Sequence, residues 1–119
     1  MLAQDLIWQD RLARSVELAG ARPDRVKTAP EFERALVGAD VAIVDLTARA
    51  YDPLVAIERA VAAGVRVLAV GQHDDVAQRK RALARGAERV LAYRKLFEDG
   101  PATVEAFISR VPRNTEAHA

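Results

Sequence analysis

Apolar residues in this chain gather in short runs that are separated by longer segments of mixed character. Two runs, at residues 41–46 and 65–70, are the most apolar and are rich in β-branched side chains. Such runs are typical of strands that are covered on both faces. Shorter or more polar strands are predicted at residues 1–4, 25–28 and 89–93. The pattern therefore predicts five strands.

Between these runs the apolar positions recur every three or four residues, which is the spacing of amphipathic helices. In the first such segment Leu12, Val16 and Ala19 share one face. Asp5 can cap its start and Gly20 ends it. Further helices are predicted to start at Pro30, at Pro53, at Asp74 or Asp75, and at Pro101.

This alternation of strand and helix predicts an α/β fold with right-handed crossovers and a parallel sheet. The most polar strand, at residues 25–28, and the charge-flanked strand at residues 89–93 suit the sheet edges. That placement favours a three-layer, flavodoxin-like arrangement with the strand order 2-1-3-4-5 and helices on both faces. The 119 residues leave room for one domain, predicted over residues 1–112, followed by a frayed polar tail at residues 113–119.

The predicted first strand is unusually short for a strand that pairs on both sides. It offers at most residues 1–4 before Asp5 caps the helix, whereas strands usually run about 5–6 residues. Either this central strand is exceptional, or the natural chain begins upstream of Met1.

Composition excludes several classes of function. The chain has no cysteine, so it can form neither a disulfide nor a thiolate metal site, and its formal net charge of +1 gives no reason to expect nucleic acid. No apolar run approaches the ~20 residues of a membrane span, and no signal peptide is apparent. We therefore expect a soluble, cytoplasmic protein that does not contact a membrane.

Enzyme signatures are also missing from the sequence. It contains no glycine-rich phosphate loop, serine elbow, nucleophilic cysteine or histidine-rich metal set. We expect no cofactor and no resident metal, and the sequence favours a binding module over an enzyme.

Ligands of open α/β sheets bind at the carboxyl ends of the strands, so the residues that follow each strand are the candidate site. Asp45 ends the third strand and is the leading candidate. The other candidate binding residues at or near this edge are Asp5, Arg11, Gly71, His73, Arg94 and Lys95. We expect Asp5, Asp45 and one of the two basic residues that follow the fifth strand to converge.

Two segments resemble the receiver domains of bacterial response regulators. Residues 39–46, Ala-Asp-Val-Ala-Ile-Val-Asp-Leu, resemble the strand that carries their phosphoacceptor aspartate, and residues 82–87 resemble the end of their fourth helix. Lys95, two residues before Phe97, stands where the receiver lysine is expected. The chain is also similar to uncharacterised bacterial receiver-like proteins. The resemblance implies a signalling module in which Asp45 occupies the phosphoacceptor position.

The departures from that pattern imply a degenerate site. Receivers hold Mg²⁺ with an acidic pair after the first strand and the phosphoacceptor aspartate, but here Gln4 replaces one carboxylate. Gly71 replaces the hydroxyl residue that senses the phosphoryl group, and Leu96 replaces the proline after the lysine. Phosphorylation of Asp45 stays open, but switching through a serine or threonine does not.

Several candidates have a plainer interpretation. Asp5 can be only a helix cap, and Arg11 either folds over the Asp5 and Asp45 carboxylates or is a surface residue. His73 can ligate a metal or make a pH-dependent contact, but a lone loop histidine usually does neither. Trp8, the only tryptophan, is either a partner anchor or a packing residue.

Three functions remain open from the sequence. The first is a degenerate receiver-like module that acts through contact with an unknown protein partner or as a homodimer. The second is a small-molecule or anion sensor whose crevice is lined by Arg11, Arg94 and Lys95. The third is a hydrolase that uses the Asp5 and Asp45 carboxylates. Between residues 74 and 95, seven basic and three acidic residues form either a docking surface or a solvated helix face.

Overall fold

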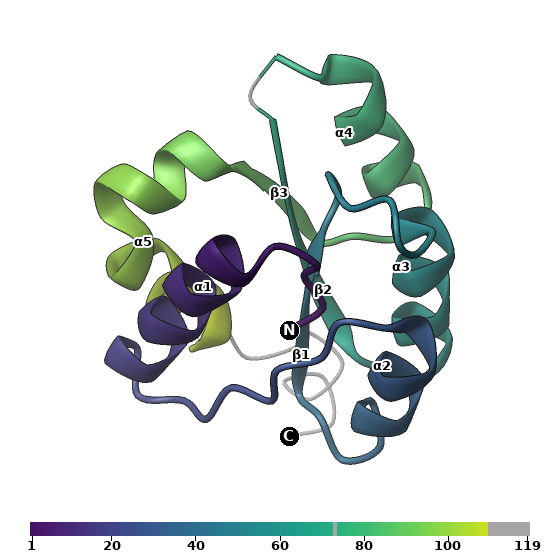
Figure 1. The fold of residues 1–119 in the computed structure, drawn as a ribbon, viewed down its shortest axis with the longest axis horizontal. Helices are drawn as coiled ribbons and strands as arrows, with labels where there is room; N and C mark the ends of the chain where they lie inside the picture. Colours follow the sequence, from purple (N-terminus) through teal and green to yellow (C-terminus); the bar gives the residue numbers. More distant parts are fainter. Residues whose placement is uncertain (73, 110–119) are drawn as a thin grey trace, which may run out of the picture.

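The computed structural model describes residues 1–72 and 74–109, and within them a parallel sheet forms the centre (Figure 1). Its three strands are β1 (Val41–Asp45), β2 (Arg66–Gly71) and β3 (Arg89–Ala92), in the order β1-β2-β3. Ile43 lies opposite Leu68, and Val70 lies opposite Leu91. The predicted α/β class and parallel sheet are confirmed.

Helices cover both faces of this sheet (Figure 1). The five helices are α1 (Leu6–Leu18), α2 (Ala29–Ala35), α3 (Pro53–Ala62), α4 (Val76–Ala84) and α5 (Tyr93–Ile108). Leu12 of α1 and Val104 of α5 pack with Ile43 in one half of the core. Phe32 of α2 and Ile57 of α3 pack in the other half, on the opposite face.

The predicted first and second strands do not form as strands. Leu2 makes one parallel bridge to Val44 and one to Val26. These are the expected neighbours, but neither bridge extends into a ladder of paired residues. The Leu2 N–H donates to the Ile43 carbonyl at 2.8 Å. Asp5 turns the chain into α1 and Thr28 turns it into α2, which leaves too few extended residues for a ladder. The predicted five-stranded sheet is therefore reduced to three strands flanked by bridges.

The last helix starts earlier than its sequence predicts. We expected a strand up to Tyr93 and a helix from Pro101, but β3 ends at Ala92 and α5 begins at Tyr93. Two helical segments join across a kink at Asp99, because Pro101 has no N–H for the hydrogen bond of a continuous helix. Gly100 lies at this kink, and a Cβ there would stand 2.7 Å from Ser15 Oγ, so the kink brings α5 close against α1. The predicted tail at residues 113–119 lies outside the described residues.

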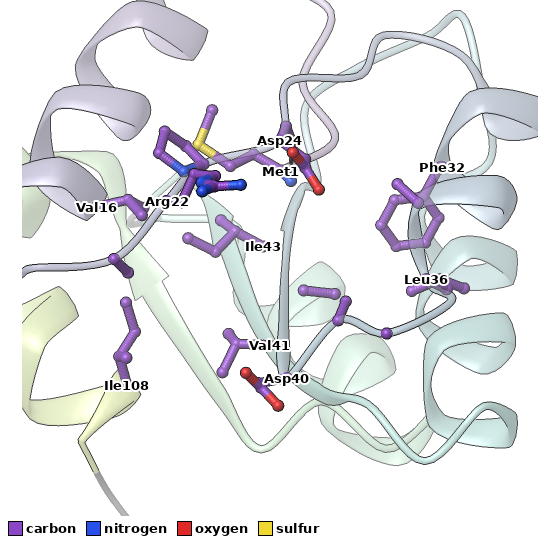
Figure 2. A pocket seen from close by; sticks show the side chains of 16 residues that line it. Met1, Val16, Arg22, Asp24, Phe32, Leu36, Asp40, Val41, Ile43 and Ile108 are labelled. Atoms are coloured by element: carbon purple, nitrogen blue, oxygen red, sulfur yellow. Dashed lines mark hydrogen bonds between the residues drawn. The ribbon is translucent and has the colours of Figure 1, made fainter.

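A cavity of about 360 Å³ opens at the amino end of β1 (Figure 2). Phe32 and Leu36 line it from the α2 side, while Val16 and Ile108 line it from the α1 and α5 side. This cavity lies at the end of the sheet opposite to Asp45, which follows from the parallel direction of the strands.

Candidate functional site

Asp45 ends β1 with its carboxylate almost wholly buried, at 1% exposure. One carboxylate oxygen, Oδ1, accepts hydrogen bonds from the Thr47 N–H at 2.9 Å and from the Thr47 hydroxyl at 2.8 Å. The other oxygen, Oδ2, is buried and has no hydrogen-bond partner among the described residues. One oxygen of this carboxylate therefore holds the loop after β1, and the other oxygen lacks a hydrogen bond.

The hydroxyl of Tyr93 is the second unsatisfied buried group of this site. Tyr93 follows β3 as the first residue of α5, and the residue is 4% exposed. Its hydroxyl has no hydrogen-bond partner among the described residues. Burial, and after it the negative charge of Asp45, raises the pKa of Tyr93. The phenol therefore stays protonated beside the Asp45 carboxylate.

Tyr51 fixes the backbone beneath the carboxylate. Its hydroxyl lies at 2.8 Å from the Asp45 carbonyl oxygen and at 3.1 Å from the Leu2 carbonyl oxygen. Burial, and then the charge of Asp45, raises the pKa of Tyr51, so it remains a donor at any ordinary pH. One phenol thus links the Leu2 bridge to the end of β1.

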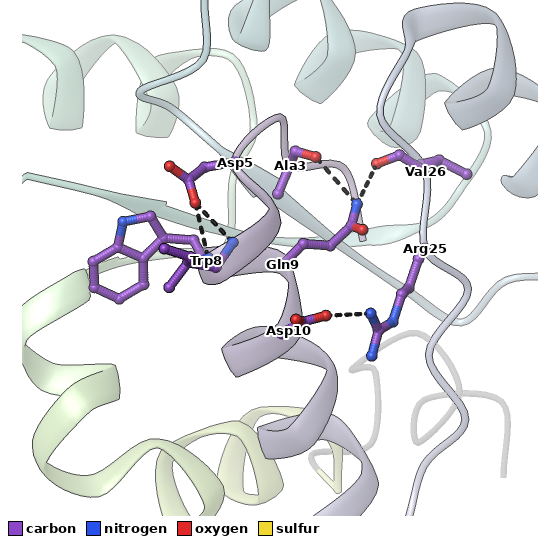
Figure 3. A network of polar contacts seen from close by, with 8 residues as sticks. Ala3, Asp5, Trp8, Gln9, Asp10, Arg25 and Val26 are labelled. Carbon is purple, nitrogen blue, oxygen red and sulfur yellow. Dashed lines mark hydrogen bonds and ion pairs between the residues drawn. The ribbon is translucent and has the colours of Figure 1, made fainter.

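Gln4 and Asp5, the pair after the Leu2 bridge, are both engaged in backbone contacts. The Gln4 Oε1 atom accepts hydrogen bonds from the N–H groups of Arg49 at 2.8 Å and Ala50 at 3.1 Å. Asp5 Oδ1 accepts from Ile7 and Trp8, as the N-cap of α1 (Figure 3). Both residues therefore hold local structure, and the helix-cap interpretation of Asp5 is the one that its contacts satisfy.

The chain's own hydrogen bonds already engage one oxygen each of Gln4, Asp5 and Asp45. The resemblance implies Mg²⁺, which prefers several oxygen ligands in a strict octahedron. The Gln4 oxygen accepts two amides, Asp5 caps a helix, and one Asp45 oxygen accepts two hydrogen bonds. Within residues 1–72 and 74–109, no three acidic or histidine side chains gather in a way that could hold a metal.

The basic residues after β3 are directed elsewhere. Arg94 is largely exposed and its guanidinium lies 3.6 Å from Glu98, one turn along α5. Lys95 lines a separate surface hollow that also includes Arg79 and Arg89. No ion pair joins Asp45 to either of the two expected partners in the described part of the chain. The hollow in front of Asp45 is lined instead by Gln4, Asp5, Asp45, Thr47, Ala48 and Arg49.

Arg11 lies on the outer surface of α1. Its guanidinium carbon stands 4.2 Å from the ring centroid of Phe97 and 5.7 Å from that of Trp8. This is the cation–π arrangement, in which the face of an aromatic ring attracts a positive charge. The basic lining that the anion-sensor hypothesis requires is therefore not assembled from Arg11, Arg94 and Lys95.

Gly71 ends β2 against the side chain of Leu46. A Cβ at Gly71 would lie 3.2 Å from Leu46 Cδ1, which is tighter than an ordinary contact. Packing thus accounts for a glycine where the resemblance predicts a hydroxyl residue. His73, the next candidate along this loop, lies outside the described residues.

The sequence does not indicate the roles of two further residues of this region. The sequence predicts Tyr93 at the end of a strand, and the charged residues that follow it carry the stronger signal for a site. Gln9 is buried, and its amide Nε2 donates to the carbonyls of Ala3 and Val26 at 3.1 and 3.0 Å (Figure 3). Gln9 lies three residues before Leu12 and shares its buried face, but a polar residue gives no hydrophobic signal there, so only the packing identifies its role.

Comparisons with known proteins agree on the fold. A two-component response regulator from Clostridium difficile superposes with a TM-score of 0.77 at 15% identity, over 92% of this chain and 93% of that chain. The signal receiver domain of the response regulator NarL from Mycobacterium tuberculosis gives 0.73 at 18%, over 92% and 94%. A response regulator from Burkholderia pseudomallei, solved with a phosphorylated aspartic acid, gives 0.68 at 18%, over 91% and 70%.

These neighbours establish that the chain has the receiver-like α/β fold. No protein-family model matches the sequence, and no curated protein matches it either. None of the helices in the described residues is long and apolar enough to cross a bilayer.

Proposed function

We propose that this chain is a degenerate receiver-like signalling module that acts through contact with another protein. In this proposal Asp45 occupies the phosphoacceptor position of an incomplete site and serves as a structural or sensory carboxylate. The receiver-like fold supports the signalling role, since solved neighbours with this fold are response regulators.

The observation that carries the proposal is the enclosed Asp45 carboxylate. Asp45 is 1% exposed, a phenol rather than an ammonium group neighbours its carboxylate, and Asp5, the other carboxylate of this hollow, uses one oxygen to cap α1. Phosphoryl transfer to an aspartate needs a donor phosphorus in line with a carboxylate oxygen and cations that neutralise the charge that develops. Burial limits access to the Asp45 carboxylate, and Arg49 is the one basic residue among those that line the hollow in front of it.

Reaction with a small acyl phosphate tests the proposal. In a working receiver an Asp45 oxygen attacks the phosphorus of acetyl phosphate, the bond from phosphorus to the acetate oxygen breaks, and acetate leaves. We expect no added phosphoryl mass by intact-protein mass spectrometry in the presence of Mg²⁺, with Asp45→Asn as the matched blank. Rapid and stoichiometric modification that Asp45→Asn abolishes would overturn the degenerate assignment.

Magnesium binding gives an independent measure of the same site. We expect calorimetry to detect no saturable Mg²⁺ binding below about millimolar, because one carboxylate ligand is replaced and Gln4, Asp5 and Asp45 each commit an oxygen to a hydrogen bond within the chain. Gln4→Asp restores the charge and should raise the affinity, whereas Gln4→Glu keeps the length of the side chain and controls for reach. Tight binding by the unaltered chain would contradict the proposal.

We also propose that the module associates with itself through helix surfaces. Leu18 and Phe97 are exposed apolar residues on α1 and α5, at 59% and 64% exposure. The segment at residues 25–28 carries Arg25 and Lys27, and such charges discourage strand pairing at that side. Sedimentation velocity over a wide concentration range should detect a dimer, and a strict monomer at the highest concentration would refute self-association.

A further inference from the structure

The edge strand β1 is paired on its outer side over only part of its length. The Leu2 N–H donates to the Ile43 carbonyl at 2.8 Å, and the Asp45 N–H donates to the Leu2 carbonyl at 2.9 Å, so the carboxyl half is covered. β1 is the first strand in the order of the sheet, and the bridge between Leu2 and Val44 is isolated. Among the described residues, no bridge or ladder reaches Val41 on this side, so the amino half of β1 is an open sheet edge.

Three backbone groups of this open edge lack a partner. The N–H and the C=O of one residue in a strand point to the same side, and the side alternates from one residue to the next. The Ile43 carbonyl faces Leu2, so the Ile43 N–H and both backbone groups of Val41 face the same side. In the described part of the chain, no backbone hydrogen bond satisfies these three groups. Unpaired groups along a strand are a template for another extended chain.

The cavity at the amino end of β1 lies along this edge (Figure 2). Val41 and Ile43 line it, together with Phe32 from one face of the sheet and Ile108 from the other. Walls that are apolar on both faces suit an extended chain with only apolar side chains, because alternate side chains point to opposite faces. The volume of about 360 Å³ lies within the ~300–1,000 Å³ of small-ligand sites. At about 3.3 Å per residue, the edge from Val41 to Ile43 accommodates about two or three residues.

Side chains of opposite charge lie at the two ends of the cavity. Asp40 directly precedes β1, and Figure 2 shows its carboxylate at the Val41 end, whereas Arg22 lies beside Met1 at the other end. Asp40 and Arg22 are exposed, and neither forms an ion pair with any described residue. Asp24 also lies at the Met1 end and partly offsets the positive charge there. A peptide that runs parallel to β1 brings its ammonium to Asp40 and its carboxylate to Arg22.

We propose that this cavity binds a short apolar peptide of about two or three residues with free ends, which adds to the open edge of β1 as a parallel strand. The peptide accepts a hydrogen bond from the Ile43 N–H and donates one to the Val41 carbonyl. In strand addition of this kind, backbone hydrogen bonds contribute affinity and pockets for the side chains contribute specificity. The site lies at the end of the sheet opposite to Asp45, so it is separate from the proposed function and does not rest on it.

Calorimetric titration of the unaltered chain with trivaline tests the site. We expect saturable binding with a dissociation constant between about 10 µM and 1 mM, which a ligand of this size can reach. Triserine has the same backbone and the same charged ends but no apolar side chains, so it should bind at least about tenfold more weakly. No saturable binding of trivaline, or equal binding of triserine, would overturn the proposal.

The amide resonances of β1 distinguish strand addition from simple filling of the cavity. Bound trivaline gives the Ile43 N–H an acceptor, so the Ile43 amide proton should move downfield as the peptide saturates the chain. The backbone groups of Val44 point to β2 and are already paired, so its amide proton should move less. An Ile43 shift no larger than that of Val44 at saturation would contradict strand addition.

Filling the cavity with a larger side chain should abolish the binding. Ala35 of α2 lines the cavity, so Ala35→Leu adds apolar volume inside it. Ala106→Leu adds the same volume at an exposed position of α5 that does not line the cavity, and it is the matched control. We expect trivaline to bind the control but not Ala35→Leu, with both variants folded by circular dichroism. Binding that persists in folded Ala35→Leu would overturn the location of the site.

An added strand gives the same test without a core substitution, which matters if Ala35→Leu does not fold. Two valines placed ahead of Met1 should lie along the open edge, because the chain at Leu2 already runs parallel to β1. This extension should abolish trivaline binding and raise the urea midpoint of unfolding. An extended chain that still binds trivaline would place the peptide elsewhere and contradict the proposal.

Peptides with blocked ends test the orientation. Asp40→Asn should weaken the binding of trivaline about two- to fivefold and leave N-acetyl trivaline unchanged, because acetylation already removes the ammonium. Arg22→Gln should weaken the binding of trivaline by less, since Asp24 offsets part of its charge, and should leave the C-terminal amide of trivaline unchanged. Equal weakening of the free and acetylated peptides by Asp40→Asn would overturn the parallel orientation.

Discussion

The two ends of the sheet differ in how they are filled. At the carboxyl end, Asp45, Tyr51 and Tyr93 are buried polar groups in the region where ligands of this kind of fold usually bind. At the amino end, Phe32 and Leu36 border a cavity of about 360 Å³ (Figure 2). Both ends thus carry hollows of similar volume, about 370 Å³ in front of Asp45 and about 360 Å³ beside Phe32, but only the Phe32 end is bordered mainly by apolar side chains.

This difference shows what each end contributes. The polar end orients its side chains and backbone through hydrogen bonds, because every buried donor or acceptor that lacks a partner is costly. An apolar end contributes through burial, because its stabilisation grows with the apolar surface removed from water. Substitutions at the two ends should therefore change the free energy of unfolding by different amounts.

The largest effect is expected at the apolar end. Phe32→Ala removes a side chain that is 2% exposed in the core between α2 and the sheet. Such truncations cost about 3–5 kcal/mol, and the existing cavity beside Phe32 gives the structure little scope to collapse into the space. Urea unfolding should measure the loss, and Phe97→Ala, at an exposed position, should change stability by less than about 0.5 kcal/mol. Equal losses would contradict the description of Phe32 as a core residue.

A smaller effect is expected from the polar end. Tyr51→Phe removes the hydroxyl that contacts the Asp45 and Leu2 carbonyls and leaves the ring in place. The loss of a buried donor should cost about 1–3 kcal/mol in the same unfolding experiment. Tyr93→Phe is the matched control, because its hydroxyl contacts no backbone carbonyl, and it should cost less than Tyr51→Phe. A larger loss for Tyr93→Phe than for Tyr51→Phe would reverse the roles of the two phenols.

The Leu2 bridge should open more readily than the central strand. The amides of Leu2 and Ala3 are held only by a pair of isolated bridges, whereas Val44 lies within the β1–β2 ladder. Fewer hydrogen bonds must break to expose the first two amides, so their hydrogen exchange should be faster by NMR. Equal protection would indicate that Tyr51 and Gln9 tie down the first residues as firmly as a full strand.

The smallest effect concerns acid and the start of α2. Hydrogen bonds from the Lys27 N–H and the Thr28 hydroxyl lower the pKa of Glu31 below its ordinary value of 4.5. A lowered folded-state pKa means that this contribution to stability is present above the unfolded-state value and is lost as the pH falls through the folded-state value. Glu31→Gln should therefore flatten the pH dependence of stability only on the acid side of 4.5, as followed by unfolding at several pH values. A difference confined to neutral pH would point to another group.

Local sequence indicated the fold class, two of the strands and the first helix. The apolar runs at residues 41–46 and 65–70 identified β1 and β2, and the helical spacing identified α1, which Asp5 caps as predicted. The end of the third strand also indicated where Asp45 lies. These features depend on the spacing of apolar positions, which is two residues in a strand and three to four in a helix and can be seen within a short segment.

Only the tertiary structure decided which side chains meet at the candidate site. Because α5 begins at Tyr93, each following residue is turned by about 100° around the helix. Tyr93 therefore faces Asp45, while Arg94 and Lys95 are rotated towards Glu98 and the α4 side. Burial then decides which polar groups stay without partners, because it depends on the packing of both faces of the sheet at once. No local pattern in the sequence carries that information.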